Sequence, residues 1–179
     1  MFTKRARVMA IALVAGAAML VTTAGSAALA DNDIDGLRVR LSGYQEDPLA
    51  LSTTGSGQFR ALVNNSAQEV GYRLSYANLE GNITQAHIHL GGRAQSGGIM
   101  VFLCTNAGNG PAGTQPCPAA PATITGTIRP ADVIGPAAQG IAAGQFNEFV
   151  AAIRAGTAYV NVHSSQYPAG EIRAQLDHH

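Results

Sequence analysis

Two histidines stand two residues apart in the stretch Gln85-Ala86-His87-Ile88-His89-Leu90. Successive side chains of a β-strand point to opposite faces, so in a strand His87 and His89 share one face and the apolar residues share the other. Neutral imidazoles are ligands of copper and zinc, and two of them on one strand face can bind the same ion. A third ligand must come from another strand.

A second stretch, Tyr159-Val160-Asn161-Val162-His163, alternates in the same way and places its two valines on one face. The opposite, polar face carries His163, which is therefore the candidate third ligand. We expect a metal site of His87, His89 and His163, with copper the first choice and zinc the second. Whether the two polar faces meet is not fixed by the pattern.

The residues that share or adjoin these polar faces could orient the imidazoles by hydrogen bonds. Asn161, Glu171 and Arg173 are the candidates for this orienting role. A plainer interpretation makes Glu171 and Arg173 a surface pair and lets the three histidines stabilise the sheet with no ion present. The remaining two histidines, His178 and His179, end the chain and are expected to form a tail.

The first thirty residues have the pattern of a secretory signal peptide. Lys4, Arg5 and Arg7 precede an apolar run from residue 8 to residue 21, and Ala28-Leu29-Ala30 is a small-residue cleavage site. We expect a signal peptide over residues 1–30, one domain over residues 31–179, and a secreted protein, extracellular or periplasmic. The alternative is an uncleaved membrane anchor.

The charge of the mature chain bears on its partners. Residues 31–179 contain eight arginines, no lysine and eleven acidic residues, which gives a net charge near −3. The charges are scattered along the sequence, and this argues against nucleic acid or a membrane surface as the partner. A protein or cell-surface partner is left open.

Cys104 and Cys117 bracket a segment rich in turn formers. In an exported protein such a pair is expected to form a disulfide, whereas metal ligation would need two reduced thiolates.

The rest of the mature chain reads as short alternating strands separated by turns. Phe146, Phe149, Val150 and Ile153 follow helical spacing, and Gly156 can end that helix. About eight strands and one short helix predict an all-β fold, an antiparallel two-sheet sandwich.

Several of these stretches together resemble the CHRD domain, a family named for its occurrence in chordin. They are Ala86-His87-Ile88-His89, the helix end Ile153-Arg154-Ala155-Gly156, Tyr159–His163, and Pro168-Ala169-Gly170-Glu171-Ile172-Arg173; the stretch Leu41–Pro48 is similar to the opening of the family. The resemblance runs from about Leu37 to Leu176. It implies an extracellular β-sandwich of immunoglobulin-like or superoxide-dismutase-like appearance, as found in secreted bacterial proteins.

These observations lead to three hypotheses about function. The first is a non-enzymatic secreted CHRD module that binds a partner or a copper or zinc ion. The second is a copper-dependent redox enzyme, because the histidine pattern also resembles the copper site of superoxide dismutases, although those sites use a fourth histidine. The third is a purely structural domain with no metal. We assign no catalytic residue; only the second function would place redox chemistry, at the same three histidines.

Overall fold

The computed structural model describes residues 36–177, so the predicted signal peptide over residues 1–30 and the pair His178-His179 lie outside the described residues. The described chain contains strands β1 (Leu37–Ser42), β2 (Ser56–Asn64), β3 (Glu69–Ala77), β4 (Ile83–Leu90), β5 (Ile99–Thr105), β6 (Ala122–Ile128), β7 (Ala158–Ser164) and β8 (Ile172–Gln175). One α-helix, α1 (Phe146–Arg154), and three short 3-10 helices, η1 (Gly43–Gln45), η2 (Pro130–Asp132) and η3 (Ala137–Gln139), complete it.

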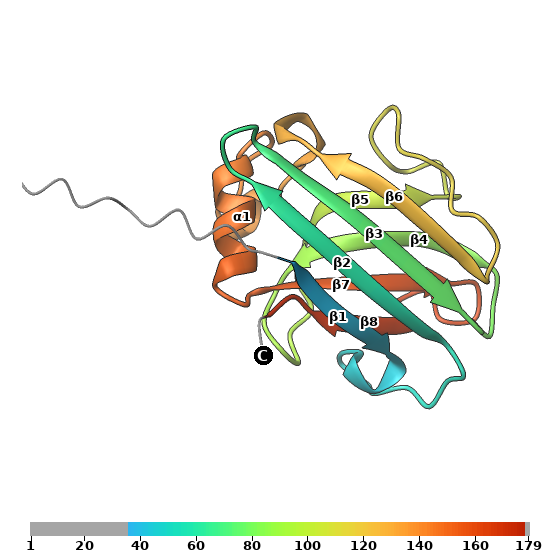
Figure 1. Ribbon diagram of the computed structural model, residues 1–179. Helices are drawn as coiled ribbons and strands as arrows, with labels where there is room; N and C mark the ends of the chain where they lie inside the picture. The colour runs from blue at the N-terminus through green and yellow to red at the C-terminus, as the bar shows by residue number, and fades with distance from the viewer. Residues whose placement is uncertain (1–35, 178–179) are drawn as a thin grey trace, which may run out of the picture. The chain divides into compact units, whose positions relative to one another are not determined.

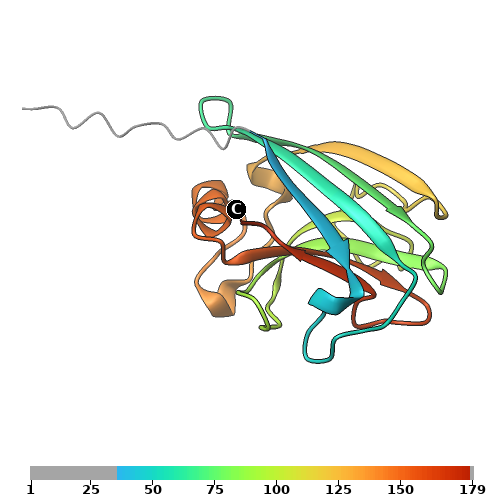
Figure 2. The same ribbon diagram turned by 60° about the horizontal axis from the view of Figure 1, so that its bottom comes forward.

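All eight strands belong to one antiparallel sheet, in the order β5-β4-β7-β8-β1-β2-β3-β6. The sheet curls, so that the half formed by β1, β2, β3 and β6 faces the half formed by β4, β5, β7 and β8 (Figures 1 and 2). The predicted all-β fold is thereby confirmed. The two expected sheets are continuous because β1 pairs with β8, where Ser42 lies opposite Arg173.

The core lies between the two halves and follows the predicted alternation. Leu37, Leu41 and Phe59 point inward and are almost fully buried. Helix α1 lies at one end (Figure 1) and buries Phe149 and Ile153, as the helical spacing predicts. Burying such side chains stabilises the fold by about 1.5–3 kcal/mol each. No helix among residues 36–177 is long and apolar enough to span a membrane.

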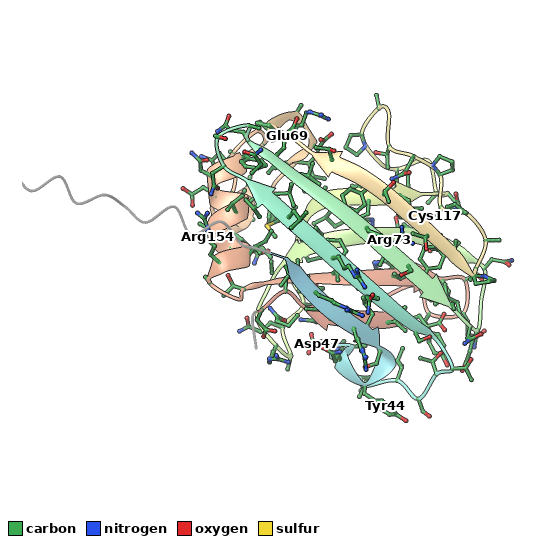
Figure 3. The ribbon with its side chains drawn as sticks, viewed as in Figure 1. Tyr44, Asp47, Glu69, Arg73, Cys117 and Arg154 are labelled. Atoms are coloured by element: carbon green, nitrogen blue, oxygen red, sulfur yellow. A yellow bond between two sulfur atoms is a disulfide. The ribbon has the colours of Figure 1, made fainter. Side chains whose placement is uncertain are left out.

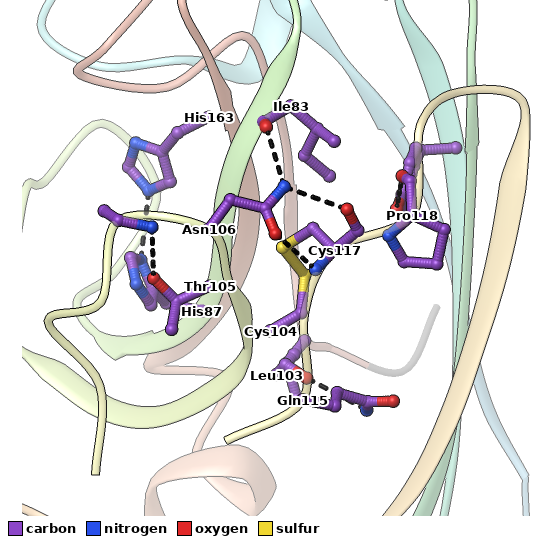
Figure 4. The surroundings of a disulfide bond; sticks show 12 residues. Ile83, His87, Leu103, Cys104, Thr105, Asn106, Gln115, Cys117, Pro118 and His163 are labelled. Carbon is purple, nitrogen blue, oxygen red and sulfur yellow. Dashed lines mark hydrogen bonds between the residues drawn. A yellow bond between two sulfur atoms is a disulfide. The ribbon is translucent and has the colours of Figure 1, made fainter. Parts of the chain in front are cut away.

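The two edge strands, β5 and β6, are joined by side chains rather than by a backbone ladder. Gln115 Nε2 donates to the carbonyl of Leu103 on β5 and to that of Thr125 on β6, and Tyr72 Oη on β3 also donates to the Leu103 carbonyl. The predicted disulfide between Cys104 and Cys117 is present and fastens the loop that carries Gln115 to β5 (Figure 4).

Strands β7 and β8 differ from the others because every one of their residues is buried. Their inner face packs on the core, and their outer face carries polar side chains beneath two loops, residues 91–98 and residues 43–47. Arg173 donates to the carbonyls of Gly92 and Gln95 in the first loop, and Ser96 donates to the Asp47 carboxylate, which links the two loops. This half of the molecule therefore has a second, polar interior.

Candidate metal centre

The two histidine-bearing strands are neighbours, so their polar faces form one surface. Strands β4 and β7 pair antiparallel with Gln85 opposite His163 and His89 opposite Tyr159. His87 Nδ1 lies 3.1 Å from His163 Nε2 (Figure 4), and the two ring planes meet at 61°. One ligand atom from each of His87, His89 and His163 lies within 4.8 Å of the others. The predicted triad is thus brought together in space.

The triad is buried, although it lies on the polar faces of its two strands. The exposed fractions are 1% for His87, 7% for His89 and 6% for His163. Strand β5 is the neighbour of β4 on the edge away from β7, and the ring of Phe102 on β5 contacts His87 with 4.3 Å between ring centroids. Water is therefore largely excluded from the three imidazoles.

Backbone carbonyls fix the orientation of two of the rings. His89 Nδ1 lies 2.9 Å from the Gly97 carbonyl oxygen, and His163 Nδ1 lies 2.9 Å from that of Pro168. Because a carbonyl can only accept, both Nδ1 atoms carry the proton and both Nε2 atoms carry a lone pair. A carbonyl partner on the second ring nitrogen is typical of metal-binding histidines.

The remaining hydrogen-bond pattern leaves acceptors without donors. Since His163 Nε2 carries a lone pair, His87 Nδ1 donates to it when no ion is bound, which leaves His87 Nε2 bare. Within the described residues neither His87 Nε2 nor His89 Nε2 has a hydrogen-bond partner, and both are buried. Each buried nitrogen without a partner lowers the free energy of unfolding by about 1–3 kcal/mol, and a metal ion bound by these nitrogens would offset that loss. The donor set fits copper or zinc.

Burial also keeps the imidazoles neutral. It lowers the pKa of His87 to about 2, with the charges of His163 and His89 adding to the effect. It lowers the pKa of His89 to about 4, partly opposed by the hydrogen bond to the Gly97 carbonyl. The pKa of His163 is lowered by burial as well. Neutral imidazole is the form that binds a metal ion.

Arg173 reaches the triad through an aromatic ring. Its guanidinium carbon lies 3.5 Å from the centroid of the Tyr159 ring, and the same ring stacks on His89 with 4.8 Å between centroids. Glu171 instead accepts hydrogen bonds from Thr53 Oγ1 and the Glu80 amide. The plainer interpretation of Glu171 and Arg173 as a surface pair is wrong, because loops cover both residues and leave them 0% and 2% exposed.

Glu46, in the loop after η1, joins this polar interior without having been predicted. A Cβ at Gly170 would lie 2.6 Å from Glu46 Oε2 and 2.9 Å from Asn161 Nδ2, so carboxyl and amide both pack against this glycine. Burial raises the pKa of Glu46 to about 8 despite the opposing charge of Arg173. Its only sequence signal is its place in the stretch Leu41–Pro48.

One protein-family model matches nearly the whole described domain. The model of the CHRD domain family matches residues 37–176, a range that contains all three histidines and the disulfide. This confirms the family resemblance. Neither a curated protein nor a solved structure matches the chain.

Proposed function

Because the chain belongs to the CHRD domain family, we propose that it is an exported CHRD module that holds one copper or zinc ion on the imidazoles of His87, His89 and His163. Export is supported by the signal-like residues 1–30 and by the disulfide, which persists in oxidising compartments.

The observation that carries the proposal is the pair of buried, unpartnered Nε2 atoms on His87 and His89. Buried polar atoms in folded proteins nearly always have a partner. A triad that served only to stabilise the sheet would be expected to complete its hydrogen bonds within the protein. The Nε2 lone pair of the third imidazole, His163, accepts the His87 Nδ1–H in the metal-free protein, and an ion bound by all three imidazoles would replace this hydrogen bond.

The burial of the triad favours a binding or structural ion over a catalytic one. Catalytic metal sites keep a coordination position open to water or substrate. With 7% exposure or less on each imidazole, the site has little access for a substrate. We therefore place the copper-dependent redox enzyme second.

Copper is the preferred ion of the two. Nitrogen sites bind Cu²⁺ more tightly than Zn²⁺ by the general order of divalent affinities. Zinc remains the natural occupant where copper is scarce, because three imidazoles suit both ions.

The test is the metal content of the mature chain, produced with His178 and His179 replaced by serine and loaded separately with each ion. We expect about one copper or zinc per chain, and its loss in His87→Gln and in His163→Gln. Circular dichroism and cooperative unfolding without metal establish that these variants fold. A folded parent protein that takes up neither ion, or a His163→Gln variant that binds as well as the parent, would contradict the proposal.

A further inference from the structure

The outer face of β1, β2 and β3 carries a row of arginines. Arg38 lies directly opposite Arg60, and Arg60 lies directly opposite Arg73, so three adjacent strands each present a guanidinium at the same level. Arg40 lies on the same face of β1, two residues further on. All four side chains are exposed. Figure 3 shows Arg73 on the front half of the sheet, whereas the histidines belong to β4 and β7 in the other half.

This arrangement costs stability. Adjacent strands are about 4.8 Å apart, and like charges directly opposite each other destabilise a sheet. Among residues 36–177 no carboxylate lies within ion-pair distance of these four arginines. In a mature chain of net negative charge, half of the arginines thus gather on one face. The sequence pattern had suggested scattered charge, because the register that aligns these residues is not visible in it.

The row borders a shallow hollow of about 540 Å³. Gly71 and Gly126 form part of its floor, and a Cβ at Gly71 would meet nothing within 4 Å, so the floor is open. Leu62 lines it and is 63% exposed. Thr125, opposite Arg73 on β6, continues the row with a hydroxyl.

We propose that this arginine face binds a linear polysaccharide that carries carboxylate groups. Guanidinium groups bind carboxylates through two parallel hydrogen bonds, and a row across three strands matches a chain of repeated anions better than a single anion. Leu62 is the one large apolar side chain strongly exposed on the described part of this face, whereas protein interfaces rely on aromatic and apolar anchors. The proposal does not depend on metal binding.

The test is calorimetric titration of the mature protein with polygalacturonate, with uncharged dextran as the negative control. Binding should weaken as salt is added. Arg60→Gln/Arg73→Gln should bind at least ~10-fold more weakly, since each lost charge-assisted bond is substantial. The matched control Arg93→Gln/Arg154→Gln makes the same change in net charge elsewhere and should bind as the parent does.

Melting temperature separates loss of binding from loss of folding. The Arg60→Gln/Arg73→Gln variant loses two like charges that lie opposite each other on neighbouring strands. It should therefore melt at the same temperature as the parent or higher. Equal binding by this variant and the parent, or equal weakening in the control variant, would overturn the proposal. So would tighter binding to anionic phospholipid vesicles or to duplex DNA than to polygalacturonate.

Discussion

His87 Nδ1 and His163 Nε2 lie 3.1 Å apart although the two residues are separated by 76 positions in the chain. The contact exists because β4 and β7 are adjacent and because the carbonyl of Pro168 fixes the second imidazole. It makes the site dependent on the loops that cover it as much as on the strands that carry it.

Gly97→Ala is expected to damage both the fold and the site. A Cβ at Gly97 would lie 1.6 Å from the Leu90 carbonyl oxygen, so the backbone of the covering loop must move and the Gly97 carbonyl must leave His89. We expect a loss of about 2–4 kcal/mol in the free energy of unfolding and weaker metal binding, measured by urea denaturation and metal titration.

Gly71→Ala is the matched control, because a Cβ there meets nothing within 4 Å. It should change stability by less than about 1 kcal/mol and leave the metal affinity unchanged. Equal effects of the two substitutions would contradict the role assigned to the loop.

Acid should destabilise the metal-free protein through the triad. The pKa of His87 is lowered to about 2 and that of His89 to about 4, so the unfolded chain takes up protons first. Their contribution is complete above about pH 6.5 and is lost progressively as the pH falls below that value. At pH 5, each of these two imidazoles should lower the free energy of unfolding by about 2 kcal/mol relative to neutral pH.

Urea denaturation between pH 7.5 and 5, with a chelator present, measures this loss. Glu46→Gln is the suitable background, since Glu46 titrates in the same range with the opposite sign. If His87→Gln/His89→Gln in that background showed the same pH dependence, the buried imidazoles would not be its source.

Glu46 should destabilise the protein at alkaline pH. Its folded-state pKa of about 8 lies above the unfolded value of 4.5. The stability that the neutral carboxyl contributes is therefore complete below pH 4.5, decreases as the pH rises, and is lost once the pH passes through 8. Glu46→Gln keeps the shape without the charge and should make the protein more stable than the parent at pH 8.5, by about 1 kcal/mol or more. Chemical denaturation at pH 6 and 8.5 tests this. A parent that is equally stable at both pH values would count against a buried neutral carboxyl.

Removing the disulfide should weaken the fold but spare the triad. Cys104 and Cys117 are separated by 13 positions, and closing so short a loop is worth roughly 3 kcal/mol in the chain-entropy model. Cys104→Ser/Cys117→Ser should therefore unfold at lower urea concentration. Its metal stoichiometry should match that of the parent, because the three imidazoles and their carbonyl partners lie outside the bridged segment; loss of the metal would show that β5 positions His87.

The sequence pattern predicted the triad because alternation in two strands places His87, His89 and His163 on polar faces, and the antiparallel pairing of β4 and β7 makes those faces one. Burial was not predictable in the same way. It depends on the loop of residues 91–98, whose backbone carbonyls bind His89 and Arg173 without any periodic signal.

Two further features depend on information that alternation does not contain. Glu46 lies in a loop, and only the folded chain brings it to Gly170 and Asn161. The arginine row requires the register of three strands, and a shift of one residue would turn each side chain to the other face. Strand existence and inward parity were predictable, whereas loop placement and register were not.

The most direct test of the metal centre is X-ray absorption at the zinc and copper edges of the loaded mature protein with His178 and His179 replaced. Three imidazole nitrogens at about 2.0–2.1 Å are expected for zinc, with their number reduced in His89→Gln. A shell of oxygen ligands without imidazole scattering, unchanged in the variant, would show that the ion binds elsewhere and that the triad is not a metal site.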